Sequence, residues 1–274
     1  MTVQSLSEEE IRRYARHIVL PEMGGVGQAR LKSAAVLVIG AGGLGSPLLL
    51  YLAAAGVGRI GIVDDDRVDL SNLQRQVLFA SDAQGRAKAE AAAAALRRLN
   101  PLVELEVHAV RLDEGNAAGL VAAYDLVADG SDNLATRLAV HDACRALGRT
   151  LVSASVQGLD GQLTTYKAHL GSPHPCLRCL VDPGMGDDAL PSCAQAGVLG
   201  PVAGVLGTLQ AVEVVKELAG IGTSLSGTVL LYDAAAVTFD RMRLRRRTAC
   251  PGPSCVFAGL GAARMSQQEE SVSL

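Results

Sequence analysis

A group of polar and charged side chains follows the apolar segments in the first half of the chain, and these residue types suit phosphate binding. Phosphate recognition requires a planar cationic fork and a point charge beside backbone amides, and Arg75 and Lys88 supply these two groups. A magnesium ion that bridges phosphates needs one or two carboxylates, which Asp132 or Asp129 supplies. None of these residues is diagnostic alone. The candidate nucleotide-binding side chains are Asp64, Asn72, Arg75, Gln76, Lys88 and Asp132.

The first element that positions them is an unbroken apolar run, 36–39, which predicts a buried strand. A glycine-rich turn follows at 40–45 and leads into an apolar, helix-compatible segment, 46–55. A second predicted strand, 59–63, ends at Asp64, where an acid that binds ribose hydroxyls belongs, about 20 residues past the glycine turn. The order of strand, glycine turn, helix, strand and acid favours a nucleotide site over a bare glycine turn, but it leaves the nucleotide open.

Strands and helices continue to alternate as far as residue 156, which predicts an α/β fold with a doubly wound, mainly parallel, Rossmann-like sheet. We expect helices on both faces of this sheet and a C-terminal antiparallel extension. The N-terminal segment reads as a helix from Ser7 to about Leu20, followed by a loose glycine connector at 24–27. Further helices are predicted at 81–99, 134–147 and about 202–219, and further strands at 102–110, 124–128, 150–156, 162–166, 228–232 and 237–240.

The chain divides by pattern into four parts within one domain. We expect an N-terminal helical arm at 1–30, a nucleotide-binding Rossmann-like half at 31–156, and a half at 157–257 that holds glycines, prolines and cysteines. The small, polar segment 258–274 is predicted to be disordered.

Composition excludes several classes of function. The formal net charge is −3 and aromatic residues make up 3%, so neither general attraction to nucleic acid nor base stacking is expected. The apolar stretch 194–212 contains glycines and a proline and falls short of a membrane span. No secretory signal is recognisable, and six cysteines in 274 residues do not suggest a secreted disulfide scaffold, so we expect a cytoplasmic protein. Five arginines within 241–247 are interpreted as a solvated strand end.

The order of motifs resembles the MoeB/ThiF group, the bacterial branch of the ubiquitin-activating-enzyme superfamily. The resemblance covers roughly residues 7–255, and Ser-Asn-Leu-Gln-Arg-Gln at 71–76 is its most specific part. The matching motifs are Arg13-Tyr14-x-Arg16, Gly40-x-Gly42-Gly43-x-Gly45, Asp64-x-Asp66, Ser71 to Gln76, Gly85-x-x-Lys88, Asp132-Asn133, Pro175-Cys176-x-x-Cys179, Cys193-x-x-Ala196-Gly197 and Gly207-Thr208-Leu209-Gln210-Ala211.

The resemblance implies a reaction with MgATP and the C-terminal Gly-Gly tail of a ubiquitin-like, β-grasp sulfur carrier protein. The tail carboxylate attacks the α-phosphorus and gives an acyl-adenylate and pyrophosphate, and a separate sulfur donor, a cysteine desulfurase or a rhodanese, then permits thiocarboxylate formation. It implies ATP binding by Gly42, Gly43, Asp64, Asp66, Ser71, Asn72, Arg75, Gln76, Lys88, Asp132 and Asn133, with Asp132 on the magnesium ion. It also implies a homodimer in which Arg16 reaches the partner subunit's phosphates.

The cysteines fall into separate roles. Cys176 and Cys179 have the spacing of a metal half-site, and Cys250 and Cys255 form the second half, so we expect a structural zinc held by all four. The second pair has four intervening residues where the family usually has two. Cys193 matches a cysteine that some relatives use in acyl or persulfide transfer, although a buried free cysteine is an equally good interpretation.

Other functions remain as alternatives. An NAD-dependent dehydrogenase would explain the glycine turn and Asp64 but not the 71–76 cluster, Lys88 or the cysteine pairs. The presence of Asp132, Arg75 and Lys88 argues against a non-catalytic binding subunit. An adenylating enzyme that acts on a peptide or a tRNA base stays open, as does the pathway: molybdopterin, thiamin, cysteine, tRNA thiolation or siderophore synthesis.

Overall fold

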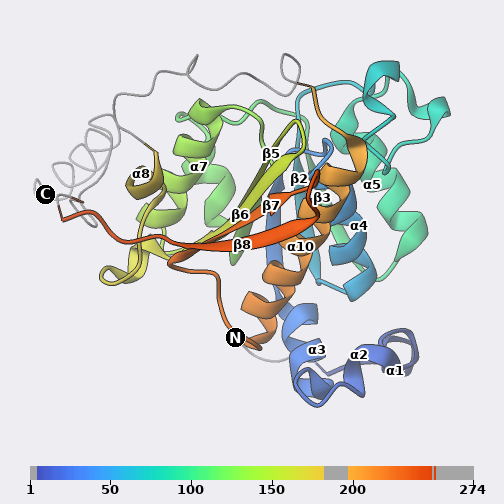
Figure 1. The fold of residues 1–274 in the computed structure, drawn as a ribbon. Coiled ribbons are helices and arrows are strands. Elements are labelled where there is room, and N and C mark those ends of the chain that lie inside the picture. Colours follow the sequence, from blue (N-terminus) through green and yellow to red (C-terminus); the bar gives the residue numbers. More distant parts are fainter. Residues whose placement is uncertain (1–4, 182–196, 249, 251–274) are drawn as a thin grey trace, which may run out of the picture.

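The computed structural model describes residues 5–181, 197–248 and 250. One eight-stranded sheet in the order β3-β2-β1-β4-β5-β6-β7-β8 forms the centre of the molecule (Figure 1). Its strands are β1 (Ala35–Ile39), β2 (Arg59–Val63), β3 (Glu104–His108), β4 (Leu126–Asp129), β5 (Thr150–Gln157), β6 (Asp160–Tyr166), β7 (Thr228–Asp233) and β8 (Thr238–Arg243).

The sheet has a parallel part and an antiparallel part. Strands β3, β2, β1, β4 and β5 are parallel neighbours, whereas β5 to β8 pair antiparallel in sequence order. All five residues of β1 are buried, as expected for a central strand covered on both faces. The predicted fold class, with its C-terminal antiparallel extension, is confirmed.

Helices cover both faces of the sheet, as Figure 1 shows. The helices are α1 (Glu8–Arg13), α2 (Ala15–Ile18), α3 (Gly24–Ser33), α4 (Gly45–Ala55), α5 (Lys88–Leu99), α6 (Ala117–Ala122), α7 (Leu134–Ala146), α8 (Leu177–Leu180) and α10 (Gly200–Ala219), with short 3₁₀ turns η1 (Leu70–Asn72), η2 (Ser81–Ala83) and η3 (Ala168–Leu170). Side chains of α3, α4, α5 and α10 form one core on the first face. Side chains of α6, α7 and α8 form a second core on the opposite face.

The N-terminal segment forms two short helices instead of the predicted single one. Ser7 caps α1 in a capping box with Glu10, as the acidic start predicts. The helix breaks at Tyr14, which is buried and whose hydroxyl accepts a hydrogen bond from Asn100 Nδ2 at 2.8 Å. Figure 1 shows α1 and α2 lying outside the layers that cover the sheet.

The prediction of a loose connector at 24–27 is wrong, because this segment begins helix α3. A Cβ atom at Gly27 would lie 2.8 Å from Met23 Sδ and 3.7 Å from Ala219 Cβ, so the glycine allows α3 to pack closely on α10. Arg30 then donates to the carbonyl of Ala219 at 2.7 Å. Tertiary packing therefore overrides the low helix propensity of glycine.

The apolar stretch that required a membrane check lies mostly in α10, which packs on the sheet. Buried Gln210 in this helix donates to the carbonyls of Asp129 and Val152 at 2.9 and 3.0 Å. Among the described residues, no helix is long and apolar enough to cross a membrane. Two further differences from the sequence predictions are that α5 begins at Lys88 rather than near Ser81, and that α6 was not predicted.

Candidate functional site

A cavity of about 750 Å³ opens at the carboxyl ends of β1, β2 and β4 and extends over the β5–β6 hairpin. The strand order changes direction between β1 and β4, and ligands of open α/β sheets bind at such a switch point. The cavity contains most of the predicted nucleotide-binding residues: Gly42, Gly43, Asp64, Asp66, Asn72, Arg75, Gln76, Lys88, Asp132 and Asn133. The fold brings these residues together in one cavity, and their part in nucleotide binding stays a prediction.

The glycine turn brings bare backbone to the edge of the cavity. Gly40 adopts a φ of +87°, and its amide donates to the Val63 carbonyl at 2.8 Å, which ties the turn to β2. A Cβ atom at Gly45 would lie 1.9 Å from the Gly40 carbonyl oxygen, so only glycine fits at the start of α4. The glycine positions thus keep side chains away from the surface that a nucleotide would approach.

Asp64 stands at the end of β2 with both carboxylate oxygens already oriented. Oδ2 accepts from the Ala41 amide at 2.8 Å and Oδ1 from the Asp66 amide at 3.0 Å. Burial raises the pKa of Asp64 above its ordinary value, and the nearby Lys88 ammonium partly opposes this shift. Each oxygen keeps a second lone pair, so the fixed carboxylate can still accept hydrogen bonds from ribose hydroxyls.

The segment 71–76 forms a small network around Asn72. Asn72 Oδ1 accepts from Arg75 at 3.1 Å and from Gln76 Nε2 at 2.9 Å. The Ser71 carbonyl accepts from Arg75 Nη1 at 3.1 Å, which fixes the guanidinium beside the glycine turn. Ser71 itself does not line the cavity, and its hydroxyl donates to Asp69 at 2.6 Å.

Lys88 is the first residue of α5 and lies almost completely inside the cavity wall. Its side chain is 6% exposed and forms a 2.8 Å ion pair with Asp66, whose side chain is 67% exposed. The Lys88 amide also donates to the Asp66 carbonyl at 2.9 Å. Two bonds between the same residues therefore hold the ammonium next to Asp64.

Of the two carboxylates considered for magnesium, only Asp132 is accessible. Asp132 is exposed and lines the cavity. Asp129 is buried and accepts from the Ser131 amide at 2.9 Å and from Ser153 Oγ at 3.2 Å. Asn133 caps α7 by accepting from the Thr136 amide at 2.9 Å, so this helix begins at the cavity rim.

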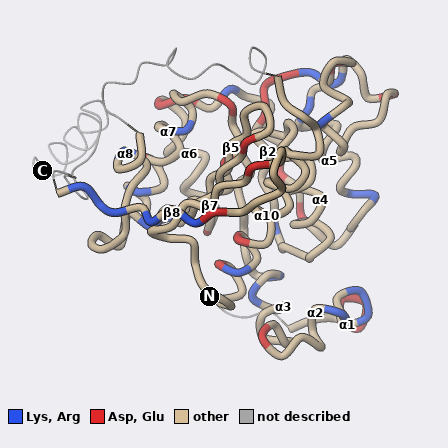
Figure 2. Tube along the Cα trace, viewed as in Figure 1, with Lys and Arg blue, Asp and Glu red and all other residues tan. Residues whose placement is uncertain are grey.

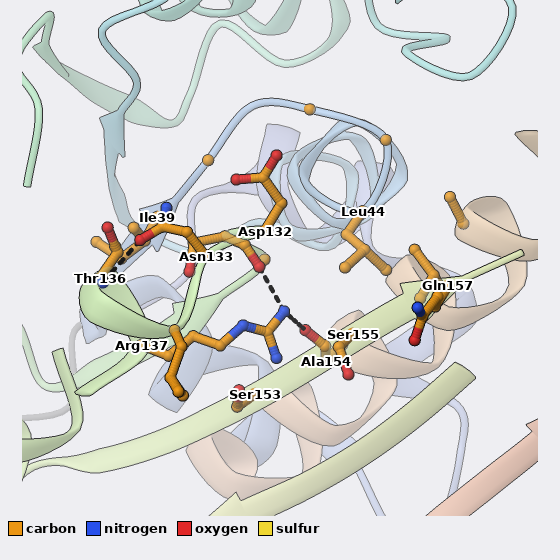
Figure 3. A pocket seen from close by; sticks show the side chains of 18 of the residues that line it. Ile39, Leu44, Asp132, Asn133, Thr136, Arg137, Ser153, Ala154, Ser155 and Gln157 are labelled. Atoms are coloured by element: carbon orange, nitrogen blue, oxygen red, sulfur yellow. Dashed lines mark hydrogen bonds between the residues drawn. The ribbon is translucent and has the colours of Figure 1, made fainter. Parts of the chain in front are cut away.

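Several cavity residues were missed because their sequence context is that of ordinary helix and strand positions. Arg137, on the first turns of α7, donates to the carbonyls of Ser131 and Ala154 and projects across the cavity wall (Figure 3). Other polar residues, Ser153, Ser155 and Gln157, come from β5 and share this wall. An arginine in a helix usually reads as a solvated charge, so only the fold reveals its position.

The cavity contains polar atoms that lack partners within the described part of the chain. Gln76 Oε1 and Ser131 Oγ are buried and make no hydrogen bond there. Both residues line the cavity, beside two cations, Arg75 and Lys88. Orphaned polar atoms next to cations and bare glycine backbone fit a polar, phosphate-bearing ligand such as ATP.

Two predicted residues lie elsewhere. Arg16 is exposed on α2 and does not line the cavity of its own chain. Cys193 lies outside the described residues, as does Cys255. Cys144 is buried on α7, and this burial raises the pKa of its thiol.

A cysteine cluster lies beside the cavity, next to α8. Cys176, Cys179 and Cys250 converge, with Sγ–Sγ distances of 3.6 Å between the first two and 3.7 Å from Cys176 to Cys250. Tetrahedral coordination with Zn–S bonds of about 2.3 Å requires sulfurs about 3.8 Å apart, so the three donors fit zinc. Burial and the neighbouring sulfurs raise the pKa of Cys176 to about 12, which a bound cation would reverse.

Comparisons with known proteins agree with this geometry. The model of the ThiF family matches residues 14–252. Adenylyltransferase and sulfurtransferase MOCS3 of Bos taurus is 54% identical over 255 residues, which cover 93% of this chain and 54% of that protein. Sulfur carrier protein adenylyltransferase of Thermus thermophilus is 47% identical over 247 residues, which cover 89% of this chain and 91% of that protein.

The chain spans about half the length of the MOCS3 relatives that it matches. Among solved structures, E. coli MccB gives a TM-score of 0.77 at 21% identity and covers 90% of this chain and 73% of its own. PaaA gives 0.74 at 23% identity, with 90% of this chain and 77% of its own. These two likenesses concern the fold. The family match and the two close relatives identify the chain as a member of the ThiF family.

Proposed function

We propose that this chain adenylylates the C-terminal glycine carboxylate of a ubiquitin-like, β-grasp sulfur carrier protein. The observation that carries the proposal is the convergence of Asp64, Arg75, Lys88 and Asp132 around the glycine turn in one cavity. Its size, about 750 Å³, suits a nucleotide together with an extended peptide end. The names of the MOCS3 and Thermus thermophilus relatives, both adenylyltransferases, support the same reaction.

The reaction needs positioning and charge neutralisation rather than a protein nucleophile. The tail carboxylate, ionised at neutral pH, attacks the α-phosphorus while the bond from that phosphorus to the bridging oxygen breaks and pyrophosphate leaves. In the proposed arrangement Asp64 binds the ribose, and Arg75 and Lys88 bind phosphate oxygens. Asp132 would hold a magnesium ion, which supplies charge neutralisation on the phosphates when bound.

The part of the cavity over the β5–β6 hairpin suits the carrier's tail. Its polar lining includes Ser155 and Gln162. Its apolar lining includes Leu177 and Leu180 of α8, and Val181, which directly follows that helix. A glycine tail suits this part of the cavity, because glycines present no side chains that would collide with the lining residues. Membership of the ThiF family favours this acceptor over a nicotinamide substrate, a peptide or a tRNA base.

We also propose the homodimer, with Arg16 acting at the partner subunit's phosphates. Exposed large apolar side chains on the N-terminal segment and on α4 and α10 are available to such an interface: Ile11, Val19, Leu20, Val26, Tyr51 and Val212. Mixing Arg16→Ala and Asp132→Ala subunits tests it. Heterodimers should regain activity in one of their two sites, and an absence of complementation would contradict the arrangement.

Three further proposals accompany this function. A zinc ion held by the Cys176 cluster has a structural role, sulfur comes from a separate donor, and the protein works in the cytoplasm. The division into an arm at 1–30, a nucleotide-binding half at 31–156 and a carrier-binding, crossover-loop and zinc half at 157–257 also remains a proposal. Strand β5 of the one sheet runs across the boundary at residue 156.

The decisive experiment is ATP–pyrophosphate exchange with Gly-Gly-ending β-grasp proteins from the same organism. We expect exchange with at least one carrier and none with a carrier whose last glycine is deleted. Exchange with no carrier, together with thermal stabilisation by NAD but not by MgATP, would refute the adenylation proposal in favour of a dehydrogenase. Exchange that requires a peptide or a tRNA would support adenylation but would show that the acceptor is not a carrier protein.

A further inference from the structure

A second cavity, of about 660 Å³, lies at the end of the antiparallel extension and is lined by four arginines: Arg241, Arg243, Arg245 and Arg246. Ser172 and His174 line its other side, together with Ser226 and Thr228 at the start of β7. Strand β7 begins at Thr228 and ends at Asp233, which pairs with Asp160 of the nucleotide cavity. The two cavities share no lining residue, but they are neighbours, since Thr164 of the nucleotide cavity donates from its hydroxyl to the Thr228 carbonyl at 2.7 Å.

The arginines lack acidic partners in the part of the chain that the structure describes. No ion pair there includes any of the five arginines of 241–247, and one side-chain bond, Arg246 to the Cys250 carbonyl at 3.4 Å, is formed. Figure 2 shows this basic run continuing from β8 without an intervening acid. Apart from these five arginines the formal charge of the chain is −8, because −3 minus 5 equals −8. Like charges gathered on an acidic protein repel one another unless an anion is bound.

Strand β8 leaves one edge unpaired within the part of the chain that the structure describes. It is the last strand of the sheet, and all six of its residues are exposed. Arg241 and Arg243 are opposite Leu230 and Thr228 of β7, so their side chains share one face of the sheet, about 7 Å apart along the strand. Asp240 lies on the other face, opposite Leu231.

Charged residues on an edge strand usually prevent unwanted strand pairing. Here the two arginines on one face of the strand have the same sign, so they repel a basic strand and complement an acidic one. A guanidinium forms paired hydrogen bonds with a carboxylate, which makes the selection geometric as well as electrostatic. The cavity beside the strand gives room for the acidic side chains.

We propose that β8 is a docking strand for an extended acidic segment of another polypeptide, which adds to the sheet as a ninth strand. Carboxylates at alternate positions of that segment pair with Arg241 and Arg243, and its backbone hydrogen-bonds to the free edge of β8. A duplex nucleic acid suits the surface less well, because the basic strip is only one strand wide and the remaining surface is acidic. The proposal does not depend on the adenylation proposal, since no residue that lines this second cavity also lines the nucleotide cavity.

Fluorescence anisotropy with a labelled peptide that has glutamate at every second position tests this inference on the full chain. The double variant Arg241→Gln/Arg243→Gln should weaken binding about tenfold. The control Arg97→Gln/Arg98→Gln, with the same charge change on exposed positions of α5, should bind like the unaltered protein. Methylating alternate amides of the peptide should also weaken binding, because strand addition needs the backbone.

Charge reversal provides a second test that does not rely on loss of binding. Arg241→Glu/Arg243→Glu should switch preference to a peptide with lysine at every second position. The docking proposal would be overturned if Arg241→Gln/Arg243→Gln and Arg97→Gln/Arg98→Gln bound the acidic peptide with equal affinity. It would also be overturned if a peptide with the same number of glutamates in one block bound as tightly as the alternating peptide. Preferential binding of pyrophosphate or of a single-stranded oligonucleotide at these arginines would overturn the class of partner.

Discussion

The ion pair between Lys88 and Asp66 is asymmetric, and this asymmetry makes the substitution Asp66→Asn informative. The carboxylate is 67% exposed, so its own desolvation is slight, whereas the ammonium is 6% exposed and depends on its partner. Removing the carboxylate charge leaves a buried cation without its ion-pair partner, which costs about 1–3 kcal/mol. For a chain of this size that corresponds to a fall in Tm of about 2–12 °C.

Differential scanning fluorimetry, with Asp65→Asn as the matched control, measures this effect. Asp65 is the exposed neighbour in the same cavity rim, so its substitution makes the same charge change without removing the partner of Lys88. We expect the control to change Tm by about 1 °C or less. Saturating MgATP should narrow the gap between Asp66→Asn and the unaltered protein, because the phosphates replace the missing carboxylate. Equal Tm values for the two variants, or a gap that MgATP leaves unchanged, would refute this account of Lys88.

Three other predictions follow from the site and its surroundings. Asp132→Ala should abolish pyrophosphate exchange with no change in Tm, since the side chain is exposed, and retained exchange would disprove the magnesium assignment. Metal analysis should find about one zinc per chain, and Cys176→Ser should remove it and lower Tm, while much less than one zinc in the purified protein would exclude the structural zinc. Burial lowers the pKa of His141 below its ordinary value, so the unfolded chain takes up the proton first and stability should fall as pH decreases below about 6.5. Urea unfolding should show that the free energy of unfolding decreases less between pH 7 and pH 5 for His141→Gln than for the unaltered protein. An equal decrease would assign the acid sensitivity to other groups.

The predictable parts of the fold are those whose conformation is determined by residues close to them in the sequence. A short apolar run that ends at a glycine turn, such as 36–39, favours a buried strand, and Gly45 is required because a Cβ atom there would clash with the Gly40 carbonyl. Alternation of such segments fixed the fold class. By contrast, α3 depends on α10 of the same fold, since Gly27 allows close packing on Ala219 and Arg30 donates to the Ala219 carbonyl.

The site residues also divide into those that the sequence could identify and those that depend on the fold. Cys176, Cys179 and Cys250 could be grouped across 74 residues because thiol pairs at metal-ligand spacing have few other uses in a long chain. Arg137 could not be identified, because its function in the wall comes from two carbonyls, of Ser131 and Ala154, that only the paired ends of β4 and β5 bring to it. A residue whose role depends on backbone groups of other elements leaves no pattern in its own neighbourhood.

The misplaced start of α5 and the chemistry of the site have one cause. Ser81 looks like a helix start, yet the chain forms only the turn η2 there, and Gly85, at a φ of +82°, donates from its amide to the Val68 carbonyl. The chain then runs beside the segment after β2, and the Lys88 amide bonds to the Asp66 carbonyl before the helix begins. Starting the helix at Ser81 would remove that pairing and carry the ammonium away from Asp64. The later start of the helix, against the local helix signal at Ser81, is therefore what places a cation beside Asp64.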